Sequence, residues 1–96
     1  MNLNQCREKI DSIDTQILVL LNRRAVLVKC IGAIKAAAGL PIVDAEREDA
    51  ILRSVSRDNP GDMSDEAALR IYRQILDESR KLQVENAAMK NGEPTK

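Results

Sequence analysis

Apolar residues recur at every third or fourth position over the first 38 residues of the chain. That spacing places them along one face of a long helix, which we predict from about Asn4 to Ala38. Gly39 and then Pro41 follow, a combination that ends helices. One position of the series, Arg24, is charged. The series consists of Leu3, Cys6, Ile10, Ile13, Ile17, Leu20, Arg24, Leu27, Ile31, Ile34 and Ala38.

Two shorter amphipathic segments complete the chain. Asp44 is a favourable N-cap for a second helix, and Ser64 for a third that continues to about Met89. No strand pattern competes, so we predict an all-α fold of three helices in a single domain, 1–96, with residues 90–96 as a disordered tail. The expected apolar faces comprise Ile51, Leu52 and Val55, and Leu69, Ile71, Tyr72, Ile75, Leu76 and Leu82.

The first helix is too long for a compact domain of this size. Its 35 residues span roughly 52 Å at 1.5 Å per residue, whereas a compact 96-residue globule is only about 30–35 Å across. Its central part is apolar on almost every side, and the other two helices are too short to cover it. We therefore predict an intertwined helical homodimer. A simple coiled coil is the alternative, but it does not need so broad an apolar surface.

Composition narrows the possible partners. Fifteen basic and fifteen acidic residues cancel, which argues against nucleic acid or a membrane as a partner. The polar N-terminus does not resemble a secretory signal, and no apolar run is long enough to span a membrane. Cys6 and Cys30 lie roughly 36 Å apart on one predicted helix, so we expect free thiols and a cytoplasmic location. With no histidine and no cysteine cluster, we expect no metal site.

Arg24 brings a permanent charge into the apolar series. A guanidinium held away from water requires an anion beside it, supplied by another residue or by a ligand. Lys35 lies about 20° further round the helix and roughly 16 Å along it, a gap that a small dianion fits between two long side chains. Arg7 lies roughly 26 Å before Arg24 on another face. It therefore reaches such a site only from the second chain of an antiparallel dimer.

Polar residues also interrupt the apolar faces of the shorter helices. Glu48 lies on the apolar side of the second helix, and Ser79 and Gln83 continue the line of Ile75 on the third. These residues include no pair of nucleophile and base. They suit an anion held by charge-assisted hydrogen bonds, without covalent or redox chemistry.

Each of these residues also has a purely structural interpretation. Arg24 can form a buried ion pair with Glu48 or another carboxylate, Lys35 can interact with the negative end of its helix, and Arg7 can be a solvated surface charge. Several inward-facing polar residues at once favour one shared site over as many separate accidents.

The order of these residues is similar to that of the all-helical class of chorismate mutases. The similarity covers nearly all of residues 3–87, and its most specific part is the spacing from Lys35 through Asp44 to Arg47 and Glu48. The residues that carry it are Arg7-Glu8-Lys9-Ile10, Ile13-Asp14, Leu20-Leu21, Arg24, Gly32, Lys35, Pro41-Ile42-Val43-Asp44, Arg47-Glu48, Ile75-Leu76-Asp77-Glu78-Ser79 and Gln83.

The resemblance implies a cofactor-free rearrangement of chorismate to prephenate, in phenylalanine and tyrosine biosynthesis, by an intertwined homodimer with two active sites. Arg24 and the Arg7 of the other subunit would hold the two carboxylates of chorismate, with Ser79 assisting. Lys35 and Gln83 would donate to its ether oxygen.

The second helix completes the implied site. Glu48 would accept a hydrogen bond from the ring hydroxyl, with Arg47 orienting it and the Asp44 backbone nearby. The implied apolar lining is Ile31, Ile51 and Leu76.

Three other functions compete with this one. Isochorismate pyruvate lyases share the scaffold and the cations, but the arrangement of Asp44, Arg47 and Glu48 favours a mutase. The chain can instead be a mutase-like regulatory or binding partner of a larger shikimate-pathway enzyme, active mainly in its company. A purely structural helical dimer would not bind chorismate at all.

Overall fold

The computed structural model describes the backbone of residues 1–90 and the side chains of residues 1–86. It contains three helices: α1 (Leu3–Ala38), α2 (Ala45–Asp58) and α3 (Asp65–Lys90). No strand occurs within residues 1–90, so the predicted all-α fold is confirmed. Lys90, expected in the tail, is still helical, and the disorder predicted beyond it concerns residues outside those described.

Local hydrogen bonds set the helix ends where the sequence predicts them. The Asn2 side chain accepts from the backbone N–H of Gln5, whose own side chain accepts from the N–H of Asn2, both at 2.9 Å. This capping box satisfies two donors that a helix start leaves unpaired. Gly39 ends α1 in the left-handed region, at φ 69°. Asp44 and Ser64 cap α2 and α3 by accepting from backbone N–H groups at 3.0 and 3.1 Å.

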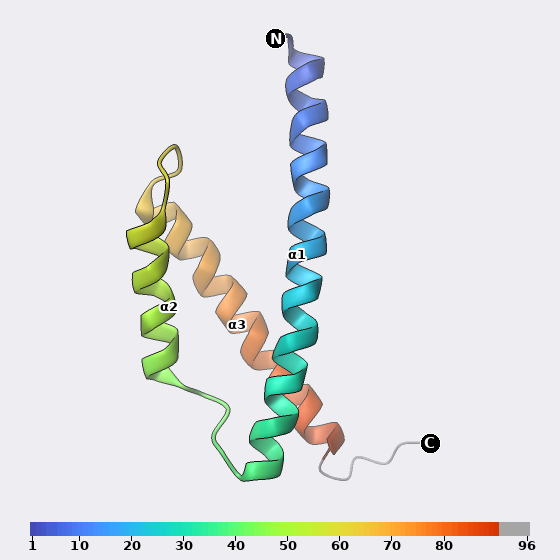
Figure 1. The fold of residues 1–96 in the computed structure, drawn as a ribbon, viewed down its shortest axis with the longest axis vertical. Coiled ribbons are helices and arrows are strands. Elements are labelled where there is room, and N and C mark those ends of the chain that lie inside the picture. Colours follow the sequence, from blue (N-terminus) through green and yellow to red (C-terminus); the bar gives the residue numbers. More distant parts are fainter. Residues whose placement is uncertain (91–96) are drawn as a thin grey trace.

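α3 is the centre of the arrangement, because it packs against both other helices, whereas the backbones of α1 and α2 do not approach each other closely. In Figure 1, α3 crosses the C-terminal half of α1, and α2 runs beside the other end of α3. The N-terminal half of α1 projects away from both. The molecule measures 55 × 34 × 14 Å, with a radius of gyration of 17.0 Å. A compact chain of this length would have about 12–13 Å, so the predicted overhang of the first helix is confirmed.

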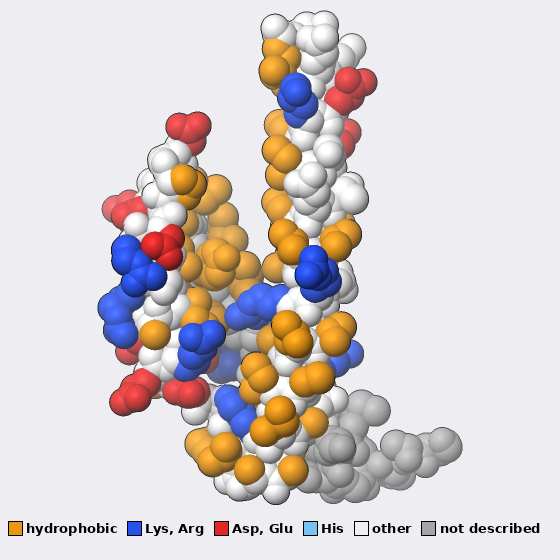
Figure 2. All heavy atoms as spheres, in the orientation of Figure 1, with side chains coloured by type: hydrophobic (Ala, Val, Ile, Leu, Met, Phe, Trp, Pro, Cys, Tyr) orange, Lys and Arg blue, Asp and Glu red, His pale blue; other side chains and the backbone are white. Residues whose placement is uncertain are grey.

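The apolar series on α1 has no cover within one chain. Every residue from 1 to 23 is exposed, including Ile10 at 54% and Ile17 at 48%. Figure 2 shows hydrophobic side chains along this projecting half. Further along α1, Leu27 is 64% exposed, and on α3 Ile71 and Tyr72 are exposed as well. The chain's own helices therefore leave this apolar surface largely uncovered, as predicted for a first helix that is too long for the other two to cover.

The chain's own core is small and lies where α1 crosses α3. Val28 and Leu76 are its buried apolar residues among those described. Gly32 allows the close approach: a Cβ atom there would lie 3.1 Å from the Gln83 Cα. Within the described residues, none of the three helices has the length and hydropathy needed to cross a bilayer.

We predict that Gly32→Ala destabilises the fold. Glycine to alanine within a helix normally stabilises by about 1 kcal/mol, but here the added methyl meets the backbone of α3, and overpacking costs about 1–3 kcal/mol. Urea denaturation should show a lower free energy of unfolding. The pair Cys30→Ala and Cys30→Gly, at an exposed position of the same helix, measures the propensity difference alone. A more stable G32A variant would contradict the observed contact between α1 and α3.

Candidate active site

One cavity is lined by residues of all three helices, near the crossing of α1 and α3. Its volume is about 300 Å³. Figure 2 shows basic side chains gathered in the hollow between α1 and α2. Both buried polar residues among those described, Ser79 and Gln83, line this cavity. Of the eleven site residues predicted from the sequence, ten line it: Arg24, Ile31, Lys35, Asp44, Arg47, Glu48, Ile51, Leu76, Ser79 and Gln83.

Arg24 is held by a hydroxyl and not by a carboxylate. Its Nη1 donates to the Ser79 Oγ, which in turn donates to the Ile75 carbonyl oxygen at 2.8 Å. Arg24 forms no ion pair with any of the described carboxylates. The structural interpretation in which Arg24 pairs with Glu48 is therefore wrong, because Glu48 pairs with another residue. The Arg24 guanidinium is fixed in place with its charge uncompensated by the described part of the chain.

Lys35 joins the last turn of α1 to the loop that leads into α2. Its Nζ donates to the Ile42 carbonyl oxygen at 2.9 Å, in a half-buried position. An ammonium group has three N–H donors, so this contact orients the side chain and leaves two donors for other acceptors. Because Lys35 lines the same cavity as Arg24, these donors are available to an anion there.

Glu48 is paired with Arg80, a residue that sequence reasoning did not single out. The Arg80 Nη1 lies 2.6 Å from the Glu48 Oε1, and the Arg80 Nη2 lies 3.0 Å from the Asp77 Oδ1. The hydrogen bond to Glu48 raises the pKa of Arg80 above its usual range, and the hydrogen bond from Arg80 lowers the pKa of Asp77. The signal available in the sequence was Glu48 itself, an acid on an apolar helix face that needs a cation opposite.

Arg47, which the resemblance implied would orient Glu48, makes no side-chain hydrogen bond with it in the described chain. It lines the cavity, and its backbone N–H donates to the Asp44 side chain at 3.0 Å. Its own side chain is exposed, and the described hydrogen bonds include none from it to Glu48. In the described chain the contact with Glu48 comes from α3, and the role expected of Arg47 stays a prediction.

Gln83 presents a polar group that the described chain leaves unsatisfied. Its side chain is buried, and its amide oxygen makes no hydrogen bond with any described residue. A buried polar atom without a partner costs about 1–3 kcal/mol. Rotation of the amide presents either its oxygen or its NH₂ group to the cavity. A ligand or water that bonds to this amide would recover the cost.

The charges around the cavity favour a ligand with two negative charges. Four cations, Arg24, Lys35, Arg47 and Arg80, face two carboxylates, those of Asp44 and Glu48. The formal surplus is two positive charges, in a partly enclosed space where charge–charge interactions are stronger than in water. No group of His, Cys, Asp and Glu suited to a metal ion occurs among the described residues.

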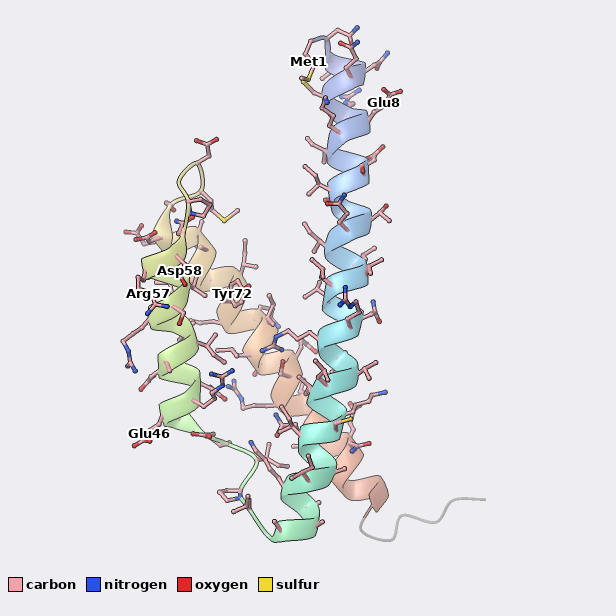
Figure 3. The ribbon with its side chains drawn as sticks, in the orientation of Figure 1. Met1, Glu8, Glu46, Arg57, Asp58 and Tyr72 are labelled. Atoms are coloured by element: carbon pink, nitrogen blue, oxygen red, sulfur yellow. The ribbon has the colours of Figure 1, made fainter. Side chains whose placement is uncertain are left out.

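Arg7 is the one predicted site residue that lies elsewhere. It is exposed on the projecting half of α1 and does not line the cavity. Figure 3 labels its neighbour Glu8 near the far end of that helix. Along the helix Arg7 is about 26 Å from Arg24, so the structure does not bring Arg7 to the cavity of its own chain.

Known proteins resemble this chain in sequence and in structure. The chorismate mutase type II family matches residues 6–84. A bifunctional chorismate mutase/prephenate dehydratase of Aquifex aeolicus is 46% identical over 78 residues, which cover 77% of this chain and 22% of that protein. A chorismate mutase of Methanocaldococcus jannaschii is 32% identical over 84 residues, covering 84% and 83% of the two chains. A chorismate mutase structure (form II) from Thermus thermophilus aligns with a TM-score of 0.83 and 32% identity, covering 84% of this chain and 92% of that one.

The extent of these matches differs between the relatives. The chain spans about a fifth of the length of the bifunctional relatives that it matches. The Methanocaldococcus and Thermus proteins are instead matched over most of their length. Because the family matches most of the chain, and a relative of 32% identity is covered over 83% of its length, this chain belongs to the chorismate mutase type II family.

Proposed function

We propose that this chain is a chorismate mutase, an isomerase that converts chorismate to prephenate for phenylalanine and tyrosine biosynthesis. The observation that carries the proposal is the cavity in which Arg24 has no acidic partner among the described residues, and in which cations outnumber carboxylates by two. A dianion with an ether oxygen between its charged ends uses all of these groups. We propose that residues 1–96 form one such domain and, from the exposed thiols Cys6 and Cys30, that it works in the reducing cytoplasm.

The arginines bind the two carboxylates of the substrate. Arg24, oriented by Ser79, binds one carboxylate of chorismate through charge-assisted hydrogen bonds. The second carboxylate is bound by the Arg7 of a second copy of the chain. Held at both ends, the flexible side chain of chorismate lies against the ring, so that the bond-forming atoms meet in the bound state.

Lys35 and Gln83 act on the bond that breaks. As the ether C–O bond lengthens, negative charge grows on its oxygen. The Lys35 ammonium and the Gln83 amide donate to that oxygen, and these bonds strengthen as the charge develops. Both groups line the cavity, and the Ile42 carbonyl oxygen holds the ammonium in position beforehand. The step is a rearrangement within one molecule, so the mechanism uses no base, nucleophile or cofactor.

Glu48 and the apolar lining determine which molecule fits. The carboxylate accepts from the ring hydroxyl of chorismate, while Ile31, Ile51 and Leu76 contact the ring. This use of Glu48 favours the mutase over isochorismate pyruvate lyase, whose substrate carries its hydroxyl at another ring position. Assays of the purified chain with chorismate and with isochorismate separate the two activities.

The second copy of the chain is proposed from the exposed half of α1. Residues 1–23 are exposed throughout, with large apolar side chains at regular spacing. An apolar surface of that extent on a free chain favours association. Antiparallel pairing of two α1 helices would cover it and carry each Arg7 toward the cavity of the other chain.

Replacing Lys35 by alanine should abolish most turnover while leaving the fold intact. Removal of one donor to a developing oxyanion costs about 3–4 kcal/mol in transition-state stabilisation, a factor of a hundred or more. Steady-state kinetics with chorismate measure the loss, and circular dichroism and sedimentation check the fold and assembly. Lys29→Ala, at an exposed position of the same helix, is the matched control and should retain activity. Unchanged kinetics in K35A would remove Lys35 from the mechanism.

The neutral amide of Gln83 predicts activity that does not require acid. An amide does not titrate in the ordinary pH range, so the profile of kcat/KM should show no steep fall between pH 5 and 7. In Gln83→Glu, by contrast, the carboxyl group donates to the ether oxygen only when protonated. Its kcat/KM should therefore rise as the pH falls. A flat pH profile of kcat/KM in both the wild type and Q83E would show that residue 83 does not contact the reacting oxygen.

A further inference from the structure

Arg80 has both ends of its guanidinium committed within the protein. One nitrogen lies 2.6 Å from the Glu48 Oε1 of α2, and the other 3.0 Å from the Asp77 Oδ1 one turn earlier on α3. The side chain is partly buried, with 32% of its surface exposed against 23% for Glu48. The pair therefore links α2 to α3 at the wall of the cavity. Arg80 is arranged to hold another residue, since its donors are directed at protein carboxylates.

The same contact occupies only one of the two carboxylate oxygens of Glu48. Its Oε1 is bound by Arg80, whereas its Oε2 makes no hydrogen bond with the described residues. A carboxylate group with one oxygen held by a hydrogen bond presents its other oxygen as a hydrogen-bond acceptor in a fixed direction. The other charged groups at the cavity are Arg24 and Lys35 on α1, and Asp44 and Arg47 around the start of α2. The described ion pairs join none of these four to Glu48.

An ionised carboxylate is also a problem in a cavity for a dianion. Like charges a few ångströms apart repel strongly when they are partly shielded from water. Without a partner, Glu48 would oppose the binding of the substrate to which it contributes a hydrogen bond. A cation directly on Glu48 reduces this repulsion and preserves the acceptor.

We propose that Arg80 is a positioning residue for substrate recognition: it neutralises Glu48 against the dianion and directs the free oxygen of Glu48 at the ring hydroxyl. The inference rests on the proposed function, because the hydroxyl and the two charges are those of chorismate. Arg80 itself acts through Glu48 and not on the reacting atoms. Its effect falls on substrate binding more than on the chemical step, since the hydroxyl contact is the same in the ground state and in the transition state.

A double-mutant cycle tests this inference. Arg80→Met should lower kcat/KM for chorismate by about tenfold, since truncation leaves a partly buried charge unpaired, and the change should lie in KM with kcat within about threefold. In a Glu48→Gln background the same substitution should cost less than about twofold, because the group through which Arg80 acts is already neutral. Arg80→Lys keeps the charge, so its KM should return most of the way to the wild-type value.

Two further variants complete the design. Asp77→Asn removes the other partner of Arg80 and leaves the contact with Glu48, so its kinetics should match those of the wild type. Arg80→Gln, which keeps a polar, hydrogen-bonding side chain without the charge, replaces R80M if thermal melting shows that R80M does not fold.

The outcomes separate this inference from the proposed function. Three results would overturn the role of Arg80 while the mutase activity stands. They are an equal fall in kcat/KM on removing Arg80 in both backgrounds, a fall confined to kcat, and an R80K variant whose KM is no better than that of R80M. A wild-type chain that does not convert chorismate would overturn both. An increase in KM on removing Arg80 that disappears in the E48Q background supports the inference.

Discussion

The contact between Arg24 and Ser79 sets the chemistry of the whole cavity. A guanidinium at the crossing of two helices would ordinarily be neutralised by a carboxylate, but here the partner is a hydroxyl, itself bonded to the Ile75 carbonyl oxygen. The charge is held in place and left for a ligand. Lys35 is oriented in the same way by a carbonyl oxygen and not by an acid. The one cavity acid that has a cationic partner, Glu48, takes that cation from α3.

The shape of the molecule follows from the length of α1 and the small size of the core. Helix α3 contacts only the C-terminal half of α1 closely, through Val28, Gly32 and their neighbours. The other half has an apolar face and no cover within the chain. An isolated helix of such composition gains stability by burying that face. The half that requires a partner is also the half that carries Arg7, so association and completion of the site are proposed to be one event.

Sequence reasoning predicted the helices and most of the cavity for identifiable physical reasons. Asp44, Ser64 and Gly39 are strong local signals, so the helix ends predicted beside them agree closely with the structure. The helical period brought Arg24 and Lys35 to one side of α1, as the cavity lining shows. Periodicity alone indicates which face is apolar, and it was the length of the first helix that predicted how little of that face the chain itself covers.

The contact of Glu48 with Arg80 shows where such reasoning stops. Arg47 is adjacent to Glu48 in the sequence, but successive residues on a helix diverge by about 100°, and the Arg47 side chain lies exposed. Arg80 is on another helix, and its approach depends on how α2 packs against α3. No period within one helix carries that information. Contacts between helices are therefore the part of this site that required coordinates.

Mixing two inactive variants tests most directly whether the cationic cavity is completed by a second chain. Arg7→Ala and Lys35→Ala, each inactive alone, are denatured together and refolded in equal amounts. If Arg7 acts on the partner's cavity, each mixed dimer regains one intact site, and the mixture should recover about a quarter of the wild-type activity. Absence of any recovery, with mixed dimers demonstrated by mass spectrometry, would contradict a site shared between two copies.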